Sequence, residues 1–256
     1  MQNINCEFQK HFPNEYPSIF LHAHPDDESF LSGGVIIKLS QSTDVHVIYC
    51  AAALVKEEDK TITRQNEAQV SNSTLGVKSI HYLEYCESKY SQIDARPLDK
   101  VAPETLAQSI IEKITTMNLD SRAFMVSYDK YGGYGNKDHI VVHKAGRLVK
   151  KFLGQEIILY EVTINREQIL SWLQEAQGRL EEDALPKLSY WSDIFGLSEE
   201  EIDYFYELTE EELCLKKKSL SLHKSQIKKD LFPMNLNNDD FRAVFGKEYL
   251  KKVNHV

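Results

Sequence analysis

Short apolar runs alternate with amphipathic segments over the first two thirds of the chain, and this alternation limits the fold more than any other feature. Runs rich in β-branched and aromatic residues predict strands, and spacings of three to four between apolar residues predict helices. The predicted strands are 18–23, 45–50, 80–85, 123–128 and 157–162; the predicted helices are 32–39, 64–75, 103–117 and 138–152, with a polar loop at 56–63. This order favours an α/β fold, with a Rossmann-like, mostly parallel sheet and helices on both faces.

The expected strand order predicts where a site would lie. In the doubly wound order 3-2-1-4-5, the first and fourth strands are neighbours at the point where the chain changes direction. Ligands of such sheets bind outside the carboxyl ends of the strands. We therefore expect the functional residues in the segments that follow residues 23 and 128.

The last third of the chain has a different pattern. The sequence predicts helices over 166–180 and 199–229. We expect an α/β core at 1–165 and a helical C-terminal extension at 166–256 that packs on it, because no Gly/Pro/Ser-rich linker separates the two. An acidic stretch at 199–212 precedes a group of lysines, and we interpret both as solvated helix faces, with a partner-docking surface as the alternative. These lysines are Lys216, Lys217, Lys218, Lys224, Lys228 and Lys229.

Length and charge exclude several classes of protein. The 256 residues include 30 Lys and Arg against 39 Asp and Glu, which gives a net charge of −9. This balance argues against general binding to nucleic acid or to an anionic membrane. The longest apolar stretch, 45–55, is far shorter than the ~20 residues of a membrane span, and the first residues lack a signal-peptide pattern. We expect a cytoplasmic protein, and the sequence leaves a homo-oligomer open. No CxxC pair occurs, so we expect reduced thiols at Cys6, Cys50, Cys86 and Cys214.

Side chains that bind metals or protons crowd the turn after the first predicted strand, in the segment His22-Ala23-His24-Pro25-Asp26-Asp27-Glu28. Imidazole and carboxylate groups together suit a borderline metal such as zinc. The adjacent Asp26 and Asp27 point in different directions, so one can ligate a metal while the other accepts a proton. The alternative is a set of acids that only stabilises a helix N-terminus. We favour the metal, because a second cluster with a histidine occurs elsewhere.

That second cluster is Gly-rich and polar, covers 128–139 and follows the fourth predicted strand. If the first and fourth strands are neighbours, His139 can meet His24 and Asp27 in one pocket. Two histidines and one carboxylate leave an open coordination position, as a catalytic zinc requires. His143 lies one helical turn beyond His139. We favour a pocket wall or a buried core histidine for His143 over a metal ligand.

The residues Ala23-His24-Pro25-Asp26-Asp27-Glu28 resemble the AHPDDE signature of the LmbE-like, or PIG-L, family. Its members are zinc-dependent deacetylases that remove acetyl groups from N-acetylglucosamine conjugates. Later segments resemble further motifs of the family in the same order, so that the resemblance spans most of the chain. They are Arg64-Gln65-Asn66-Glu67 with Leu75-Gly76-Val77, LEYCES at 83–88, Asn136-Lys137-Asp138-His139, and KKKSLSLHKSQ at 216–226.

The resemblance implies an amide hydrolase that removes an N-acyl group from a small amino-sugar conjugate of the N-acetylglucosamine type. It implies zinc as the cofactor, held by His24, Asp27 and His139, with iron(II) as the alternative that the same ligands suit. It also implies Asp26 as the general base for a water molecule that the metal activates. Further roles that it implies are a hydrogen bond from Tyr134 to the reacting carbonyl and substrate contacts by Glu28, Arg64 and Glu87.

Some residues of these motifs depart from the family. Asn136 stands where the family has a histidine that stabilises the oxyanion or protonates the leaving amine, and that the residue at the position of Asp138 orients. An asparagine can donate a hydrogen bond but cannot transfer a proton at neutral pH. We expect Tyr134, His22 or His143 to compensate, or a substrate with a better leaving group.

Other departures alter the expected substrate pocket. Lys137 replaces a proline, Glu87 replaces an aspartate, and Glu84 replaces a glycine. The longer acid at 87 predicts a reshaped pocket for the part of the substrate beyond the sugar, whereas Glu84 is as well explained by simple exposure.

Two other functions compete with the hydrolase. A catalytically weakened or non-catalytic sugar-conjugate-binding protein on the same fold would explain Asn136, although the intact Asp26 and Asp27 argue against it. A nucleotide-binding Rossmann protein is disfavoured, because only Ser32-Gly33-Gly34 stands where a G-x-G-x-x-G motif is needed. His223 matches the late motif of the family, but a packing role is an equally good explanation.

Overall fold

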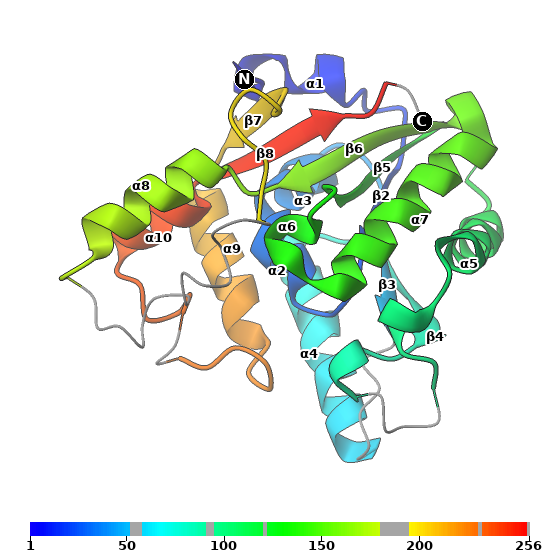
Figure 1. Ribbon diagram of the computed structural model, residues 1–256. Coiled ribbons are helices and arrows are strands. Elements are labelled where there is room, and N and C mark those ends of the chain that lie inside the picture. The colour runs from blue at the N-terminus through cyan, green and yellow to red at the C-terminus, as the bar shows by residue number, and fades with distance from the viewer. Residues whose placement is uncertain (52–57, 91–94, 120–121, 180–194, 230–231, 255–256) are drawn as a thin grey trace.

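One mixed sheet forms the centre of the protein (Figure 1). The computed structural model describes residues 1–51, 58–90, 95–119, 122–179, 195–229 and 232–254. In these residues the strand order is β1-β7-β8-β6-β5-β2-β3-β4. The strands are β1 Gln2–Asn3, β2 Ser18–His22, β3 Val45–Ala51, β4 Ser79–Tyr85, β5 Ala123–Tyr128, β6 Ile157–Thr163, β7 Tyr204–Glu207 and β8 Lys247–Lys252.

The five predicted strands are confirmed as β2, β3, β4, β5 and β6, in the predicted doubly wound order and all parallel. Every residue of β2, β3 and β5 is buried. This explains why their sequences are nearly continuous apolar runs, since a parallel strand covered on both faces has no solvent side. The first and fourth predicted strands, β2 and β5, are direct neighbours, so their carboxyl ends open on one site.

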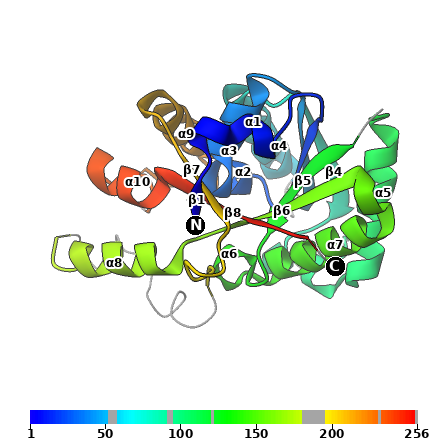
Figure 2. The ribbon, with the colours of Figure 1, turned by 90° about the horizontal axis from the view of Figure 1, so that it is seen from above.

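Helices cover both faces of this sheet. Figure 2 shows α3, α4 and α9 on one side and α5 and α7 on the other. The α-helices are α1 Phe8–His11, α2 Asp27–Leu31, α3 Gly33–Ser40, α4 Glu58–Leu75, α5 Pro103–Thr116, α6 Gly132–Gly135, α7 Lys137–Leu153, α8 Arg166–Ala176, α9 Glu210–Leu222 and α10 Asn238–Phe245. Short 3₁₀ helices lie at Asn5–Glu7, Ser88–Tyr90, Leu98–Lys100 and Gly154–Glu156.

The predicted loop at 56–63 is wrong where it can be compared. α4 already begins at Glu58 and continues to Leu75, whereas residues 56–57 lie outside the described part of the chain. The sequence at 58–63 did not predict a helix, because its residues are mostly polar and form no apolar stripe at helical spacing.

The single helix predicted over 199–229 is also wrong. It is divided into a strand, β7, and a shorter helix, α9. β7 and β8 extend the sheet beyond β6 by antiparallel pairing, so the C-terminal third supplies strands as well as helices. Thr209 begins α9 as a capping box with Glu212. Glu212 and Lys216 are buried, which contradicts a fully solvated face, because both form interior polar contacts.

Candidate metal and active site

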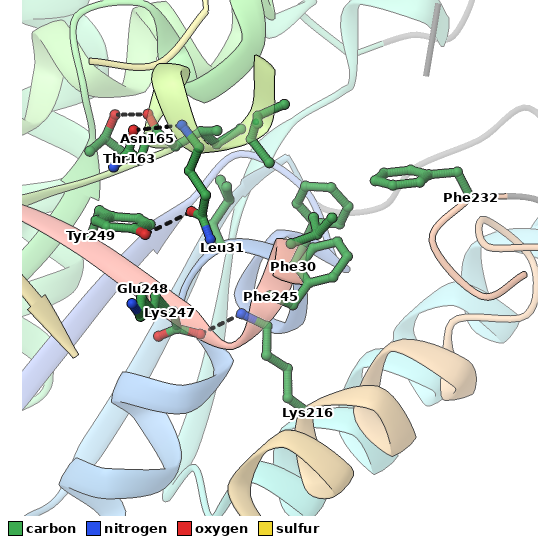
Figure 3. Close-up of a pocket in the computed structure, with 14 residues that line it drawn as sticks. Phe30, Leu31, Thr163, Asn165, Lys216, Phe232, Phe245, Lys247, Glu248 and Tyr249 are labelled. Carbon is green, nitrogen blue, oxygen red and sulfur yellow. Dashed lines mark hydrogen bonds and ion pairs between the residues drawn. The ribbon is translucent and has the colours of Figure 1, made fainter. Parts of the chain in front are cut away.

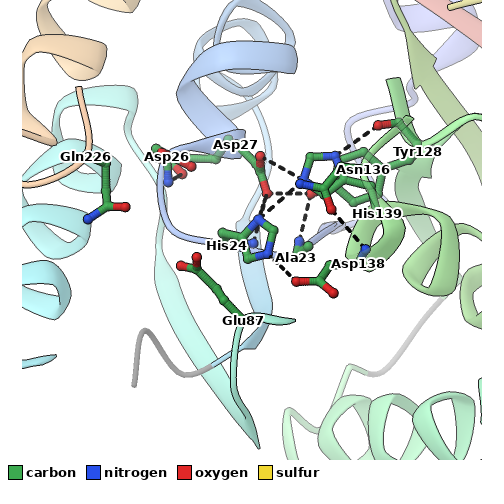
Figure 4. Close-up of polar contacts among 12 residues, drawn as sticks. Ala23, His24, Asp26, Asp27, Glu87, Tyr128, Asn136, Asp138, His139 and Gln226 are labelled. Carbon is green, nitrogen blue, oxygen red and sulfur yellow. Dashed lines mark hydrogen bonds and ion pairs between the residues drawn. The ribbon is translucent and has the colours of Figure 1, made fainter. Parts of the chain in front are cut away.

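The turn after β2 places four consecutive residues at the carboxyl end of the sheet. His24 and Asp27 point toward β5, while the carboxylate of Asp26 lines a cavity on the other side (Figure 4). The predicted divergence of Asp26 and Asp27 is therefore what the structure shows. It depends on an unusual backbone, since Asp26 has φ 123° and ψ −28°.

Three potential ligand atoms, from segments that follow β2 and β5, converge in this site. His24 Nδ1 lies 3.3 Å from His139 Nε2, His139 Nε2 lies 3.2 Å from Asp27 Oδ1, and His24 Nδ1 lies 3.4 Å from Asp27 Oδ2. The three atoms are all within 4.8 Å of one another, and the three side chains are buried. Within the described residues, this is the one group of three or more potential ligands so close together.

In each imidazole, the outer nitrogen, which is the one that faces away from the three converging ligand atoms, already has a hydrogen-bond acceptor. His24 Nε2 lies 2.9 Å from a carboxylate oxygen of Asp138, and His139 Nδ1 lies 2.9 Å from the carbonyl oxygen of Gly132. Because these oxygens accept, the outer nitrogens carry protons and the inner nitrogens can face a cation. Such outer partners are what metal-binding histidines ordinarily have, so this group of residues fits a divalent metal.

The backbone at Gly132 makes the contact to His139 possible. Gly132 has φ 62°, and a Cβ atom there would lie 2.6 Å from Cβ of His139. Any larger residue would therefore force the carbonyl of Gly132 away from the imidazole. The Gly-rich segment noted in the sequence serves this close approach.

Tyr128, the last residue of β5, fixes the third ligand. Its hydroxyl donates to Asp27 Oδ2 at 2.7 Å, and its ring stacks on His139 with centroids 4.2 Å apart. The amides of Ala23 and His24 also donate into this arrangement, to Tyr128 Oη and Asp27 Oδ2. Sequence reasoning did not assign Tyr128 a role, although its place at the end of the strand beside β2 was a usable signal.

The charges of the cluster depend on its burial and its partners. Burial alone would lower the pKa of His24, but hydrogen bonds to Asp138 and Asp27 raise it to about 10. Burial would raise the pKa of Asp27, but His139 and His24 hold it well below its usual range. Burial, and then the charge of Asp27, raise the pKa of Asp26 to about 7. A metal that binds here takes the place of the proton on His24 Nδ1.

A cavity of about 470 Å³ opens beside the three ligand atoms. That volume is within the range of small-molecule sites. Its lining is almost wholly polar and includes seven of the ten predicted site residues. The lining residues are His24, Asp26, Arg64, Glu87, Ser88, Lys89, Tyr134, Asn136, Lys137, Asp138 and Gln226.

Arg64 and Glu87 face each other across one wall of this cavity. They form a buried ion pair, and Lys89 Nζ lies 2.8 Å from the second oxygen of Glu87. Burial would raise the pKa of Glu87, but His24, Arg64 and Lys89 lower it. Sequence reasoning placed Arg64 and Glu87 in this wall but missed Lys89 and Gln226, which approach it from segments far apart in the chain.

Asp138 has a different partner from the one expected. Its carboxylate binds His24 Nε2, the amide of Ser88 at 3.0 Å and the hydroxyl of Ser88. Among the described residues, this carboxylate makes no hydrogen bond to the side chain of Asn136, which stands where the family has the histidine that such an aspartate orients. Instead, Asn136 Oδ1 accepts from the amide of Asp138 at 2.9 Å and begins α7, and its side chain also hydrogen-bonds Tyr134.

Tyr134 lies where it can serve as a donor. Its ring packs edge-on against His139, with centroids 5.1 Å apart, and it lines the cavity. Burial and the nearby charges of Asp27 and Asp26 raise its pKa well above the usual value, so the hydroxyl keeps its proton.

Glu28, His22 and His143 do not line the cavity. Glu28 is fully buried and bonded to His223, so the expected contact with a sugar has no support in this geometry. His22 Nε2 bonds Ser32, and His143 Nδ1 bonds the carbonyl of Tyr128. Neither of these histidines is placed to replace the proton donor missing at Asn136, and His143 is the buried core histidine that we expected.

The turn at Ser32-Gly33-Gly34 is closed to a phosphate. Glu248 accepts from the amides of Gly34 and Val35, both at 2.7 Å, and Lys216 Nζ lies 2.5 Å from the same carboxylate (Figure 3). These are the amides that a nucleotide would need. The structure thus argues against the nucleotide-binding alternative.

Two expectations from composition can also be compared with the structure. All four cysteines are free thiols. No helix in the described part of the chain is both long enough and apolar enough to cross a membrane.

Two solved structures with the same fold are described as deacetylases. The A40926 pseudoaglycone deacetylase Dbv21 superposes with a TM-score of 0.63 at 15% identity, over 95% of this chain and 99% of that chain. The N,N'-diacetylchitobiose deacetylase of Pyrococcus horikoshii gives 0.57 at 17% identity, over 98% and 90%.

Relatives identified by sequence have a consistent description. The 1D-myo-inositol 2-acetamido-2-deoxy-alpha-D-glucopyranoside deacetylase of Mycolicibacterium smegmatis is 24% identical, over 90% of this chain and 88% of its own length. The Corynebacterium glutamicum (strain R) protein of that description is 26% identical, over 82% and 74%. Residues 19–150, just over half of the chain, match the PIG-L family, described as GlcNAc-PI de-N-acetylase. The chain therefore belongs to the PIG-L family, and like its relatives it is a deacetylase, a hydrolase of C–N bonds other than peptide bonds.

Proposed function

We propose that the protein is a zinc-dependent N-deacetylase of a small conjugate that carries N-acetylglucosamine. The observation that carries the proposal is the convergence of His24 Nδ1, Asp27 and His139 Nε2 beside a polar cavity that Asp26 lines. The names of the relatives support the acyl group and the sugar, because they describe deacetylation of an acetamido-glucopyranoside of inositol.

His24, Asp27 and His139 would hold the metal. A zinc ion held there would supply a Lewis acid for the amide carbonyl and for a water molecule, and iron(II) would supply the same chemistry. Tyr128 and Asp138 hold two of these ligands in orientation. The contact with Asp138 leaves Nδ1 of His24 as the ligand atom, and the carbonyl of Gly132 leaves Nε2 of His139 in the same way.

Asp26 would act as the proton acceptor. Its carboxylate lines the cavity but is not one of the three converging ligands, so it is free to take a proton from the attacking water. Asn136 cannot supply a proton to the leaving amine, and His22 and His143 lie elsewhere. We therefore assign the return of the proton to Asp26 as well.

Tyr134 would stabilise the charge that develops on the carbonyl oxygen. A donor that is already fixed in place lowers the barrier without reorganisation. Its packing against His139 and its hydrogen bond with Asn136 hold the hydroxyl at the cavity wall. Arg64 and Glu87 would contact hydroxyl groups of the substrate on the opposite wall.

Asp26→Asn tests the proposal. The variant keeps the shape of the side chain but cannot accept a proton, so acetate release from N-acetylglucosaminyl-inositol should fall by ~10²–10⁴-fold. Its zinc content should equal that of the natural protein. A zinc-loaded natural protein that releases no acetate from this or other N-acetylglucosamine conjugates contradicts the proposal, as does an Asp26→Asn variant with full activity.

A non-catalytic sugar-binding protein is the second candidate, and the observation that favours it is Asn136. Its side chain caps α7, so the residue has a structural task that needs no catalysis. Calorimetry would distinguish the two candidates: binding of an N-acetylglucosamine conjugate with no turnover after zinc loading favours the second.

A further inference from the structure

Asp26 has a backbone conformation that residues with a side chain rarely adopt. Its φ of 123° lies in the region that favours glycine. Such a conformation persists only where surrounding contacts hold it, and it is common at functional sites. The contacts around this one peptide therefore decide whether the carboxylate of Asp26 reaches the cavity.

Both sides of the Asp26 backbone are fixed. Its carbonyl accepts from the amides of Ser29 and Phe30 in the first turn of α2, at 3.1 and 3.0 Å. Its amide donates to Glu28 Oε2 at 2.9 Å. Because φ is the rotation about the bond from this nitrogen to Cα, holding the N–H also sets the direction of the side chain.

The other oxygen of Glu28 is fixed by three interior donors. His223 Nε2, Ser29 Oγ and Ser71 Oγ each lie 2.8 Å from Glu28 Oε1. Glu28 is 0% exposed and His223 is 1% exposed. A buried carboxylate with this many donors, one of them an imidazole, has no freedom to turn.

A third serine completes the support. Ser219 Oγ lies 2.5 Å from Ser29 Oγ and 2.6 Å from Ser71 Oγ, and these two hydroxyls lie 2.9 Å apart. The serines come from α2, α4 and α9, so three helices meet at this point. Ser219 and His223 both belong to the late motif, KKKSLSLHKSQ, in which a packing role for His223 was the alternative.

We propose that Glu28 is a positioning residue for Asp26, and that His223 and the serine group Ser29, Ser71 and Ser219 fix Glu28 for this task. The inference rests on the proposed role of Asp26 as the proton acceptor. A carboxylate needed only for packing would not give one oxygen to the amide of the cavity residue and the other to the interior. Glu28 thus connects α9 to the cavity without touching substrate.

Glu28→Met tests the role, because it keeps the length of the side chain and removes the acceptor for the Asp26 amide. We expect kcat to fall by about 10²-fold, the cost of misplacing a reacting group by about 1 Å, with KM and zinc content unchanged. Glu28→Gln keeps an oxygen that can accept from this amide, so it should recover about tenfold of the loss. A purely structural residue would not give this split or this rescue.

Glu248→Met is the matched control. Glu248 is likewise a buried carboxylate and pairs with Lys216 of α9, but it contacts the amides of Gly34 and Val35 rather than that of Asp26. Both methionine variants should lose a similar amount of Tm, and only Glu28→Met should lose kcat. Equal losses of kcat in the two variants would overturn the proposal.

A crystal structure of the Glu28→Met protein tests the inference without any activity. We expect φ of Asp26 to return to a negative value and its carboxylate to leave the cavity; an unchanged φ overturns the positioning role even if no substrate is ever found.

If this variant does not fold, Ser71→Ala removes one of the three donors to Glu28 Oε1 and serves for the same structural comparison, with the same two outcomes. Absence of deacetylase activity in the natural protein would instead contradict the proposed function.

Discussion

The two walls of the cavity are built differently. The metal wall consists of His24, Asp27 and His139 with Tyr128 and Asp138; all five are buried, and His24 and Asp138 are the two that line the cavity itself. We call the opposite side the acceptor wall, a name that refers to the substrate and not to the proton acceptor Asp26. It combines a buried ion pair with exposed lysines, and its residues are Arg64, Glu87, Lys89, Asn136, Lys137 and Gln226. The metal wall matches the sequence pattern of the PIG-L family, whereas three of the four departures from that pattern, Glu87, Asn136 and Lys137, lie on the acceptor wall.

The difference follows from where each wall begins in the fold. The ligands of the metal wall follow β2 and β5, which are hydrogen-bonded neighbours, so the sheet itself sets their spacing. The acceptor wall comes from α4, the turn after β4, the start of α7 and the turn after α9. Apart from α7, which also carries Asp138 and His139, these elements hold no residue of the metal wall, which suits a wall that selects the substrate.

Loss of a ligand on the metal wall should have the largest effect. His24→Ala removes one of three converging atoms and leaves Asp138 without its imidazole partner. We expect the zinc content after dialysis to fall close to zero. Activity should fall by more than ~10²-fold, because loss of only a hydrogen-bond partner of a metal ligand already costs up to that much. His81→Ala, on β4 away from the cavity, is the control and should keep its zinc.

Asp138→Asn should weaken the metal wall by a smaller amount. The amide cannot match the carboxylate as an acceptor for His24 Nε2, so the imidazole becomes a poorer ligand. We expect zinc affinity to fall by ~10–100-fold, measured by competition with a chelator. Asp44→Asn, at the opposite end of β3, should leave the affinity unchanged. If Asp138→Asn binds zinc as tightly as the natural protein, the contact does not tune the metal site.

Much of the metal wall could be predicted from the sequence, because it depends on local features. Two apolar runs, each followed at once by a histidine-bearing polar cluster, locate the ends of β2 and β5. The topology of a parallel sheet then brings His24, Asp27 and His139 together. Every one of the five central strands and their order was predictable for the same reason.

What escaped prediction depends on contacts between distant segments. Glu28 and His223 are 195 residues apart, and no local pattern indicates that they pair. β7 is only four residues long and follows an acidic stretch, so it becomes a strand only through pairing with β8 and β1. The partner of Asp138 depends on how the first turn of α7 is rotated toward Ser88.

Asn136→His, on the acceptor wall, should raise kcat. A histidine there can donate a proton that asparagine cannot, and general acids are worth ~10²–10⁴-fold in rate. Because Tyr134 and Asp138 are arranged around asparagine, we expect about a tenfold rise in kcat with unchanged zinc content. Activity that arises from none would show that the natural protein is not this enzyme, and an unchanged kcat would show that Asp26 alone suffices for proton transfer.

Glu87→Asp should give the smallest effect and the one most confined to the acceptor wall. Aspartate is one methylene shorter than glutamate, so it cannot reach both Arg64 and Lys89, which bind the two oxygens of Glu87. A hydrogen bond is worth about 0.5–1.5 kcal/mol, which corresponds to a change in KM of about two- to tenfold. We expect kcat and zinc content to stay constant, because no ligand of the metal wall moves. Glu84→Asp, exposed near the end of β4, is the matched control. A fall in kcat or zinc content in Glu87→Asp would mean that the two walls are coupled, and that the separation between chemistry and substrate choice drawn from the fold does not hold.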